Sequence, residues 1–227
     1  MIIRRPPDIP SSEITPEGVY VNRRHFIRTA AAAGAIGAAM GPSALAGADP
    51  LEFRLAHLEE GRLKDVLRAA AESFGWQSRR GERKANRGVG LACGTEKDSY
   101  VAACAEVEVI DGKLGVLEVC QAYECGAIQN PRNLRAQVEG CLIMGLGAAL
   151  FEQIEFADGQ IRNPRFGSYR VPRMSDAPEL NIVLVDRKDL PSVGAGETPI
   201  IAVAPAVANA VYDAAGVRCR SMPTGSV

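Results

Sequence analysis

Apolar and polar positions follow a helical period early in the chain and a strand period after it. From Leu51 to Phe74 the apolar residues recur at i, i+3 and i+4, with a break near Gly61, which predicts helix. From Ser99 to Ile110 apolar and polar residues alternate, which predicts a strand. Asp111-Gly112-Lys113 is typical of a hairpin turn, and Leu114–Tyr123 then forms the return strand.

The same two periods predict five further elements: a strand over Val89–Cys93, a helix from Asn130-Pro131 to about Phe151, a hairpin over Gln153–Ile161, a strand over Leu180–Asp186 and a helix over Pro199–Ala215. Gly216 is placed to end the last helix. This mixture of strands and helices indicates an α+β fold, in which antiparallel strand pairs pack against two or three helices.

Composition divides the chain into four segments: a leader over residues 1–46, a helical lead-in over 49–76, a basic connector over 77–88 and a domain over 89–227. The connector is rich in arginine and interrupted by glycine. We interpret its charges as those of a solvated loop, in preference to a phosphate site. Trp76, directly before it, is interpreted as a core residue.

Composition also excludes several classes of protein. The net charge of −1 on 227 residues argues against nucleic-acid binding, which needs a basic domain. The two histidines, His25 and His57, exclude zinc sites built from several histidines. Six cysteines are too sparse for a disulfide scaffold, so we interpret them mostly as buried thiols and predict no metal-ligand set. No clean apolar run predicts a stable membrane span.

The leader has the pattern of an export signal. A twin arginine, Arg23-Arg24, precedes a run of small apolar residues from Thr29 to Met40, and Ala44-Leu45-Ala46 fits a signal peptidase that cleaves after Ala46. A buried alanine-rich helix is the alternative, but it explains neither the arginines nor the cleavage motif. The sequence therefore predicts export to the periplasm by the twin-arginine route, which carries folded proteins that often already hold a cofactor.

The segment Val193-Gly194-Ala195-Gly196-Glu197-Thr198-Pro199 is the first candidate for chemistry. Its glycines, Gly194 and Gly196, allow a ligand to approach the backbone closely. Thr198 is a plausible N-cap of the following helix, so Glu197 would lie where the helix dipole favours a carboxylate. With no cation near it in the sequence, Glu197 suits a general base. The alternative is that Glu197 only assists the cap.

Gln137 is the second candidate, about two turns into its predicted helix. Its amide can donate and accept hydrogen bonds at once, as the edge of a pterin requires. Gly140, Gly145 and Gly147 follow it, although glycine is a poor helix former. Something is therefore expected to pack or bind against the bare face that they leave. Close packing of the helix on a sheet is the alternative.

Several motifs together resemble one enzyme family. They are Asp49 to Leu55, Gly94 with Tyr100-Val101-Ala102-Ala103, Ala105 to Val109, Cys125-Gly126 with Asn130-Pro131, Gln137-Val138-Glu139-Gly140, Gly145 to Glu152, and Gly194 to Pro199. In their order and spacing they are similar to the C-terminal part of the molybdenum-binding large subunit of the xanthine dehydrogenase and aldehyde oxidase family. The exported branch typified by isoquinoline 1-oxidoreductase β subunits is the most similar.

The resemblance implies a partial molybdenum-hydroxylase C-terminal domain that binds a molybdenum-molybdopterin cofactor. Such enzymes oxidise aldehydes or N-heteroaromatic substrates with oxygen from water. The resemblance implies that Glu197 is the catalytic base, that Gln137 binds the cofactor, and that Gly194 and Gly196 belong to the cofactor site. The bacterial branch favours the cytosine dinucleotide form of the cofactor. Electrons are expected to leave through [2Fe–2S] clusters on a partner subunit, because no cluster-type cysteine spacing occurs here.

The sequence departs from the family in lacking the long stretch that normally precedes this region. We therefore expect a chain that needs the missing N-terminal half of the molybdenum subunit as a partner, together with an iron–sulfur subunit. The alternative is a non-catalytic periplasmic remnant or a binding or assembly module. The leader resembles that of the periplasmic methionine-sulfoxide reductase catalytic subunit, a likeness that concerns only the address.

Overall fold

The computed structural model describes residues 43, 46–82 and 84–224. The twin arginine Arg23-Arg24 and most of the predicted leader lie outside the described residues. The residues from Pro50 onward form one unit, which holds both candidate site segments.

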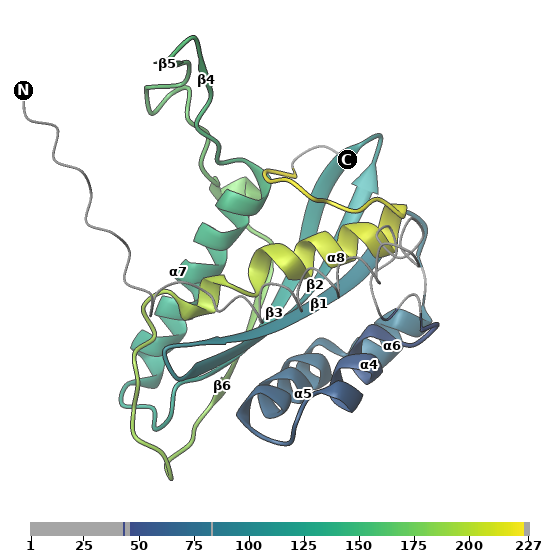
Figure 1. The fold of residues 1–227 in the computed structure, drawn as a ribbon, viewed down its shortest axis with the longest axis vertical. Coiled ribbons are helices and arrows are strands. Elements are labelled where there is room, and N and C mark those ends of the chain that lie inside the picture. The colour runs from purple at the N-terminus through teal and green to yellow at the C-terminus, as the bar shows by residue number, and fades with distance from the viewer. Residues whose placement is uncertain (1–42, 44–45, 83, 225–227) are drawn as a thin grey trace, which may run out of the picture. The chain divides into compact units, whose positions relative to one another are not determined.

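A four-stranded sheet with the order β1-β2-β3-β6 forms the centre of this unit (Figure 1). β1 (Arg87–Glu96), β2 (Ser99–Ile110) and β3 (Lys113–Glu124) form an antiparallel meander, as predicted. The fourth strand, β6 (Glu179–Val185), pairs with β3 in parallel, which adds a parallel pair to the predicted antiparallel ones. The reason is that a long helix and an extended arm separate β3 from β6, and such a crossover can return the chain in the same direction.

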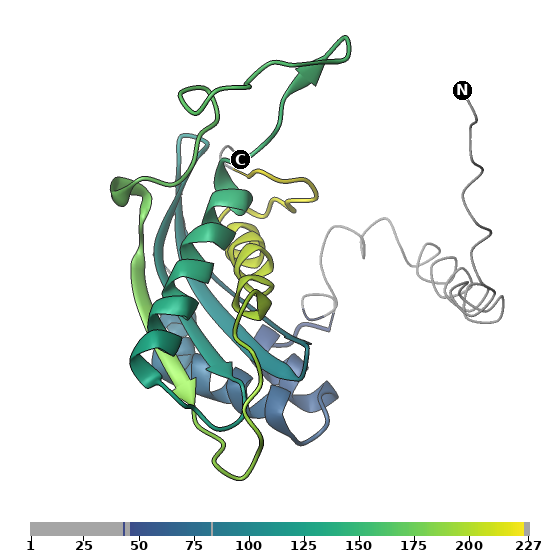
Figure 2. The same ribbon diagram turned by 90° about the vertical axis from the view of Figure 1, so that its left-hand side faces the viewer.

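Two helices cover one face of the sheet (Figure 2). They are α7 (Pro131–Leu150) and α8 (Val203–Ala215), and α8 ends at Gly216 in a left-handed conformation, as predicted. α8 lies directly on β1, because Gly88 and Gly90 offer bare backbone to it. A Cβ added to Gly90 would overlap the backbone of α8. The small residues of β1 and α8 therefore set how closely the helix and the sheet approach.

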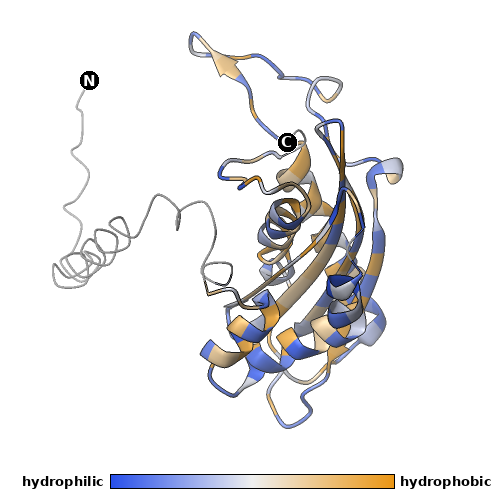
Figure 3. Cartoon of the chain, turned by 90° about the vertical axis from the view of Figure 1, so that its right-hand side faces the viewer, coloured by the Kyte–Doolittle hydropathy of each residue, from blue (hydrophilic) through white to orange (hydrophobic). Residues whose placement is uncertain are grey.

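The opposite face is covered by α4 (Pro50–His57), α5 (Arg62–Phe74) and α6 (Trp76–Gly81). Hydrophobic and hydrophilic positions alternate along these helices in Figure 3, as the sequence period predicted. The break between α4 and α5 falls at Gly61, the N-cap of α5. These helices pack on the sheet through buried side chains of their own: Val66, Leu67, Ala70, Phe74 and Trp76.

The basic connector is not a solvated loop along its whole length, which corrects the prediction for residues 77–88. α6 extends through it to Gly81, and its arginines are paired with acidic residues of the sheet and of α8. Arg79 contacts Glu106 of β2 and also Glu118 of β3 at 2.6 Å, while Arg80 contacts Asp213 of α8. These contacts pair Arg79 and Arg80 with carboxylates of the fold.

An arm rises from the end of α7 and returns to β6 (Figures 1 and 2). It contains β4 (Phe156–Ala157), β5 (Gln160–Ile161) and the single turn η2 (Met174–Asp176), so the predicted second hairpin is confirmed as two very short strands. Several large apolar side chains on the arm are exposed: Ile154, Phe156, Ile161, Phe166, Val171 and Met174.

Among the described residues, one segment, Thr198–Ala215, is long and apolar enough to span a membrane by length and composition. Its main part is α8, whose apolar face packs on the sheet. The side chains that face the sheet are Val203, Ala206, Val207, Ala210 and Val211, each of them fully buried. Burial in the core therefore accounts for the hydropathy of this segment.

A buried ion pair connects the start of α5 to the end of β3. Glu124, at the end of β3, is 1% exposed, and its Oε2 accepts a hydrogen bond from Arg62 Nε of α5 at 2.5 Å. Its other oxygen, Oε1, accepts from the Gly126 backbone N–H at 2.5 Å. Arg62 also lies over the Tyr100 ring at 4.3 Å. One carboxylate thus fixes both the first residue of α5 and the loop that leads to α7.

We predict that Gly90→Ala destabilises the protein by about 1–3 kcal/mol, because the added methyl group overpacks the contact between β1 and α8. Gly115→Ala on β3 is the matched control, since the nearest atom to its new Cβ would be Glu108 O at 3.9 Å. Chemical denaturation of both variants measures the difference. Equal midpoints for the two variants would contradict the close packing of α8 on β1.

We predict that Arg62→Met lowers the free energy of unfolding by about 3–5 kcal/mol, because it leaves the buried Glu124 carboxylate without its cation. Arg68→Met is the control, because Arg68 lies on the exposed side of the same helix and pairs there with Glu60, which precedes the helix. Its effect is expected within about 0.5 kcal/mol of the wild type. A cost for Arg62→Met no larger than that of the control would show that Glu124 does not need this partner.

Candidate functional site

A groove of about 400 Å³ lies between the start of α7 and the turn over residues 192–196. The loop after β3 closes a third side. The lining residues are Cys125, Ala127, Ile128, Gln129, Asn130, Leu134, Gln137, Ser192, Val193, Ala195 and Gly196. The groove therefore brings together the two segments that the sequence singled out, which are about sixty residues apart along the chain.

Side chains of the sheet hold the carbonyl groups of the glycine-rich turn. Gly194 O accepts hydrogen bonds from Ser99 Oγ at 2.9 Å and from Tyr123 OH at 3.1 Å. Further along, Pro199 O accepts from Gln121 Nε2 at 2.9 Å. The three donors are fully buried, and burial raises the pKa of Tyr123, which keeps its hydroxyl protonated and able to donate. The turn is thus fixed from below by the sheet.

Gln137 connects α7 to the same turn. Its Nε2 donates to Gly196 O at 2.7 Å, and the Cys141 thiol one turn later donates to the same oxygen at 3.4 Å. Because a carbonyl oxygen only accepts, this contact determines which end of the amide faces the turn. Oε1 of Gln137 has no hydrogen bond to another described residue. Burial raises the pKa of Cys141, so this thiol remains neutral.

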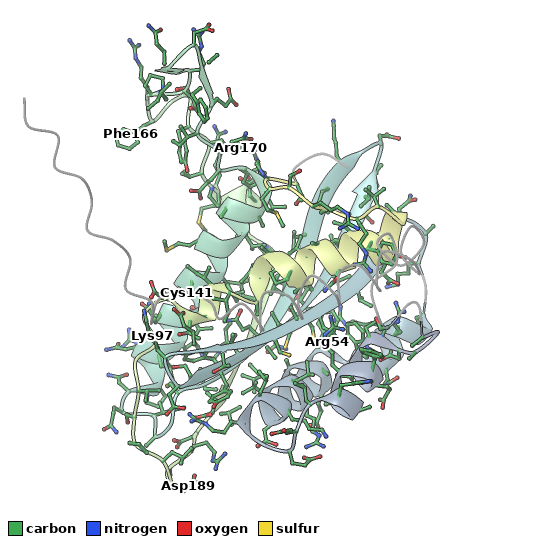
Figure 4. All side chains as sticks on the ribbon, in the orientation of Figure 1. Arg54, Lys97, Cys141, Phe166, Arg170 and Asp189 are labelled. Carbon is green, nitrogen blue, oxygen red and sulfur yellow. The ribbon has the colours of Figure 1, made fainter. Side chains whose placement is uncertain are left out.

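Glu197 lies at the end of the turn and is paired with a lysine that the sequence analysis missed. Lys97 Nζ, from the turn between β1 and β2, contacts Glu197 Oε1. This hydrogen bond and the positive charge of Lys97 lower the pKa of Glu197 below its usual range. Both side chains are exposed, at 63% for Glu197 and 67% for Lys97. Figure 4 labels Lys97 and Cys141, which flank the turn.

The predicted role of Thr198 is wrong. A short 3₁₀ turn, η3 (Thr198–Ile200), precedes α8, and Thr198 is its first residue instead of an N-cap. Its buried Oγ1 donates to Glu96 O of β1 at 3.3 Å. The helix itself starts at Val203 after Ala202, without a side-chain cap. The pKa of Glu197 is therefore lowered mainly by Lys97 and not by a helix dipole.

The glycines of the two segments separate into packing and open positions. A Cβ on Gly145 would meet Val203 of α8 at 2.9 Å, and one on Gly147 would meet Pro172 of the arm at 2.9 Å. At Gly140, Gly194 and Gly196 it would meet nothing within 4 Å. Close packing thus explains the first pair, whereas the other three leave room beside Gln137 and Glu197.

Cysteines take no part in a metal cluster within the described residues. All six thiols are free, with Cys104, Cys120, Cys125 and Cys141 buried, which confirms that they are mostly buried thiols. Over residues 46–82 and 84–224, no group of three or more His, Cys, Asp and Glu side chains is placed to hold a metal ion. The site consists of amide, carboxylate and backbone groups around an open groove.

Comparisons with known proteins identify this region. Residues 95–178 match the model of a molybdopterin cofactor-binding domain. A nicotinate dehydrogenase subunit of Pseudomonas putida is 30% identical over 195 residues, which cover 78% of this chain and 16% of that protein. The β subunit of isoquinoline 1-oxidoreductase from Brevundimonas diminuta is 34% identical over 179 residues, which cover 78% of this chain and 23% of that protein.

A solved structure agrees with these matches. The aldehyde oxidoreductase of Desulfovibrio desulfuricans has 32% sequence identity and a TM-score of 0.51, over 56% of this chain and 14% of that protein. The chain thus spans less than a quarter of the length of these two relatives. The matched span 95–178 includes β2, β3 and α7, and therefore Gln137. The chain carries a molybdopterin-binding region of the molybdenum-hydroxylase family.

Proposed function

We propose that this chain is part of the molybdenum-binding subunit of a periplasmic molybdenum hydroxylase that oxidises an aldehyde or an N-heteroaromatic compound. The main observation is that Gln137, which lines the groove, donates a hydrogen bond to Gly196 O, directly before Glu197. Residues 95–178 of the same unit match a molybdopterin cofactor-binding domain. A general base and a cofactor-binding amide are thereby joined through a single backbone carbonyl. Molybdenum bound to molybdopterin would supply the oxidation of the substrate carbon with oxygen derived from water.

The residues of the groove fit a pterin cofactor. Gln137 uses its Nε2 on Gly196 O, so its Oε1 remains to accept a hydrogen bond from a pterin N–H. Gly194 and Gly196 leave open space where other residues would place a Cβ, which lets a flat ligand approach the backbone. The volume of about 400 Å³ lies in the usual range of ligand sites.

Glu197 suits the role of the general base. It follows the turn that Gln137 contacts, and its exposed carboxylate can reach a group bound in or above the groove. A carboxylate accepts a proton only when it is ionised, as a glutamate is at neutral pH. Lys97 lowers the pKa of Glu197, which also makes the carboxylate a weaker base. Glu197 would take a proton from the water-derived group beside the cofactor that the groove would hold.

A second polypeptide would complete the site. The groove is open to solvent on its remaining side and Glu197 is 63% exposed, whereas cofactor sites bury most of their ligand. The chain spans 16% and 23% of two relatives, both named as subunits. We propose that the missing wall comes from the other part of the molybdenum subunit, and that a [2Fe–2S] subunit accepts the electrons. The cytosine dinucleotide form of molybdopterin is the proposed cofactor.

The leader motifs support a periplasmic location. Arg23-Arg24, the apolar run that follows and Ala44-Leu45-Ala46 fit a twin-arginine signal. That route exports folded proteins, so the cofactor would be inserted before export. The complementing polypeptide would then join this chain in the cytoplasm and cross the membrane with it.

The first test is the molybdenum and pterin content of the chain, purified from the periplasmic fraction with whatever remains bound to it. We expect close to one molybdenum and one pterin per chain in a complex with a second polypeptide, because the chain alone encloses only part of the site. A metal-free, solitary chain in that fraction would overturn the proposed enzyme in favour of a non-catalytic remnant or assembly module.

The second test is Glu197→Gln in the same complex. We expect turnover to fall by about 10²–10⁴-fold, because a general base contributes a factor of that size, while molybdenum and pterin content stay unchanged. Glu59→Gln, an exposed glutamate on the other face of the sheet, is the control and should leave turnover at the wild-type rate. Undiminished turnover in Glu197→Gln would show that another group is the base.

A further inference from the structure

The turn between β1 and β2 has an uncommon sequence for its geometry. Lys97 and Asp98 both adopt positive φ angles, of 49° and 59°, in a two-residue turn closed by the Glu96–Ser99 pair. Such turns favour asparagine and glycine, because a side chain at positive φ is strained. Lysine is not a residue that the turn itself requires. Its presence at the first turn position therefore needs another explanation.

Two hydrogen bonds hold this turn against the one that carries Glu197. On one flank Thr198 Oγ1 donates to Glu96 O, and on the other Ser99 Oγ donates to Gly194 O. Lys97 lies between these two contacts in the sequence of the first turn, as Glu197 does in that of the second. The two turns therefore lie side by side, which brings the side chains of Lys97 and Glu197 within reach of each other.

Arg62 fixes the same turn from the other face of the sheet. Its guanidinium donates to Asp98 Oδ1 at 2.8 Å and to Asp98 O at 2.9 Å, and it also pairs with the buried Glu124. The strained backbone around Lys97 is thus connected to the core of the protein. Strain of this kind persists when the surrounding structure determines it, and it occurs most often at functional positions.

Among the charged groups near Glu197, Lys97 is the cation that lowers its pKa. Lys97 Nζ lies 3.8 Å from Glu96 Oε1 in addition to its contact with Glu197. The other titratable groups bonded to the turn, Tyr123 and Cys141, have pKa values raised by burial and stay neutral. Within residues 46–82 and 84–224, no second lysine or arginine is paired with Glu197.

We propose that Lys97 is a positioning residue for Glu197: it holds the carboxylate beside the groove, through a contact built by the two adjoining turns. The role of Glu197 as the base rests on the function proposed above. Lys97 acts only through Glu197 and touches no reacting group. Because an exposed ion pair changes an equilibrium constant by a factor of up to about five, its contribution to turnover is modest and depends on pH.

The direct test is the titration of the Glu197 carboxylate by carbon NMR in the full chain, with Glu197→Gln to assign the signal. In Lys97→Met we expect the pKa of Glu197 to rise, because the cation that lowers it is gone. Lys97→Arg keeps the positive charge and should restore the wild-type titration. Lys113→Met, beside the next hairpin turn, is the matched control and should leave the signal unchanged. An unmoved titration in Lys97→Met would overturn the proposal.

The same variants in the molybdenum-containing complex test the role in the reaction. The acidic limb of the kcat/KM profile should move to higher pH in Lys97→Met and return in Lys97→Arg, with molybdenum content unchanged in both. An unmoved limb would reduce Lys97 to a surface ion pair and overturn its positioning role. A complex without molybdenum would overturn the proposed function instead, while the carboxylate titration would still decide whether Lys97 controls Glu197.

Discussion

Close contact between α8 and the backbone of β1 is the constraint on which the site depends. Gly88 and Gly90 let the helix lie directly on the strand, and its small residues complete the contact. The turn before α8 is therefore brought down to the ends of β2 and β3, where Ser99 and Tyr123 can bond to Gly194 O. With larger residues on β1, the helix would stand further out and these hydrogen bonds could not form.

Hydrogen bonds and ion pairs then convert this packing into a defined site. The carbonyl groups of the glycine-rich turn are bound by side chains from the sheet and from α7. Glu124, Arg62 and Asp98 form a continuous polar connection from the loop beside the groove to the turn that carries Lys97. Because the pair at Glu124 is buried, it is a strong connection, whereas the exposed pair at Glu197 is weak and responsive to pH.

The groove resembles one wall of a cofactor site, which agrees with a chain that matches only part of its longer relatives. Gly140, Gly194 and Gly196 face open space, and the carboxylate of Glu197 lies at the edge of the groove instead of in its depth. The relatives extend over more than four times the matched length, so they hold enough further chain to cover such a surface. The proposed complementing polypeptide would place the cofactor between two walls, of which this chain provides one.

Local structure and the choice of candidate residues could be read from the sequence. Periods of two and 3.6 residues identified β2, β3, α5 and α7 with bounds close to those observed, because these patterns arise from one strand or helix facing one core. The glycine-rich segment and the amide at Gln137 were recognisable because each lies within a short motif.

How these parts meet depends on contacts between distant segments, which the folded structure reveals. The pairing of Lys97 with Glu197 joins residues one hundred positions apart, and the parallel pairing of β6 depends on the path of a long crossover. The arginines of the connector likewise find their partners on strands and on α8. No local pattern encodes such contacts, because they follow from how packed layers bring distant backbone segments together.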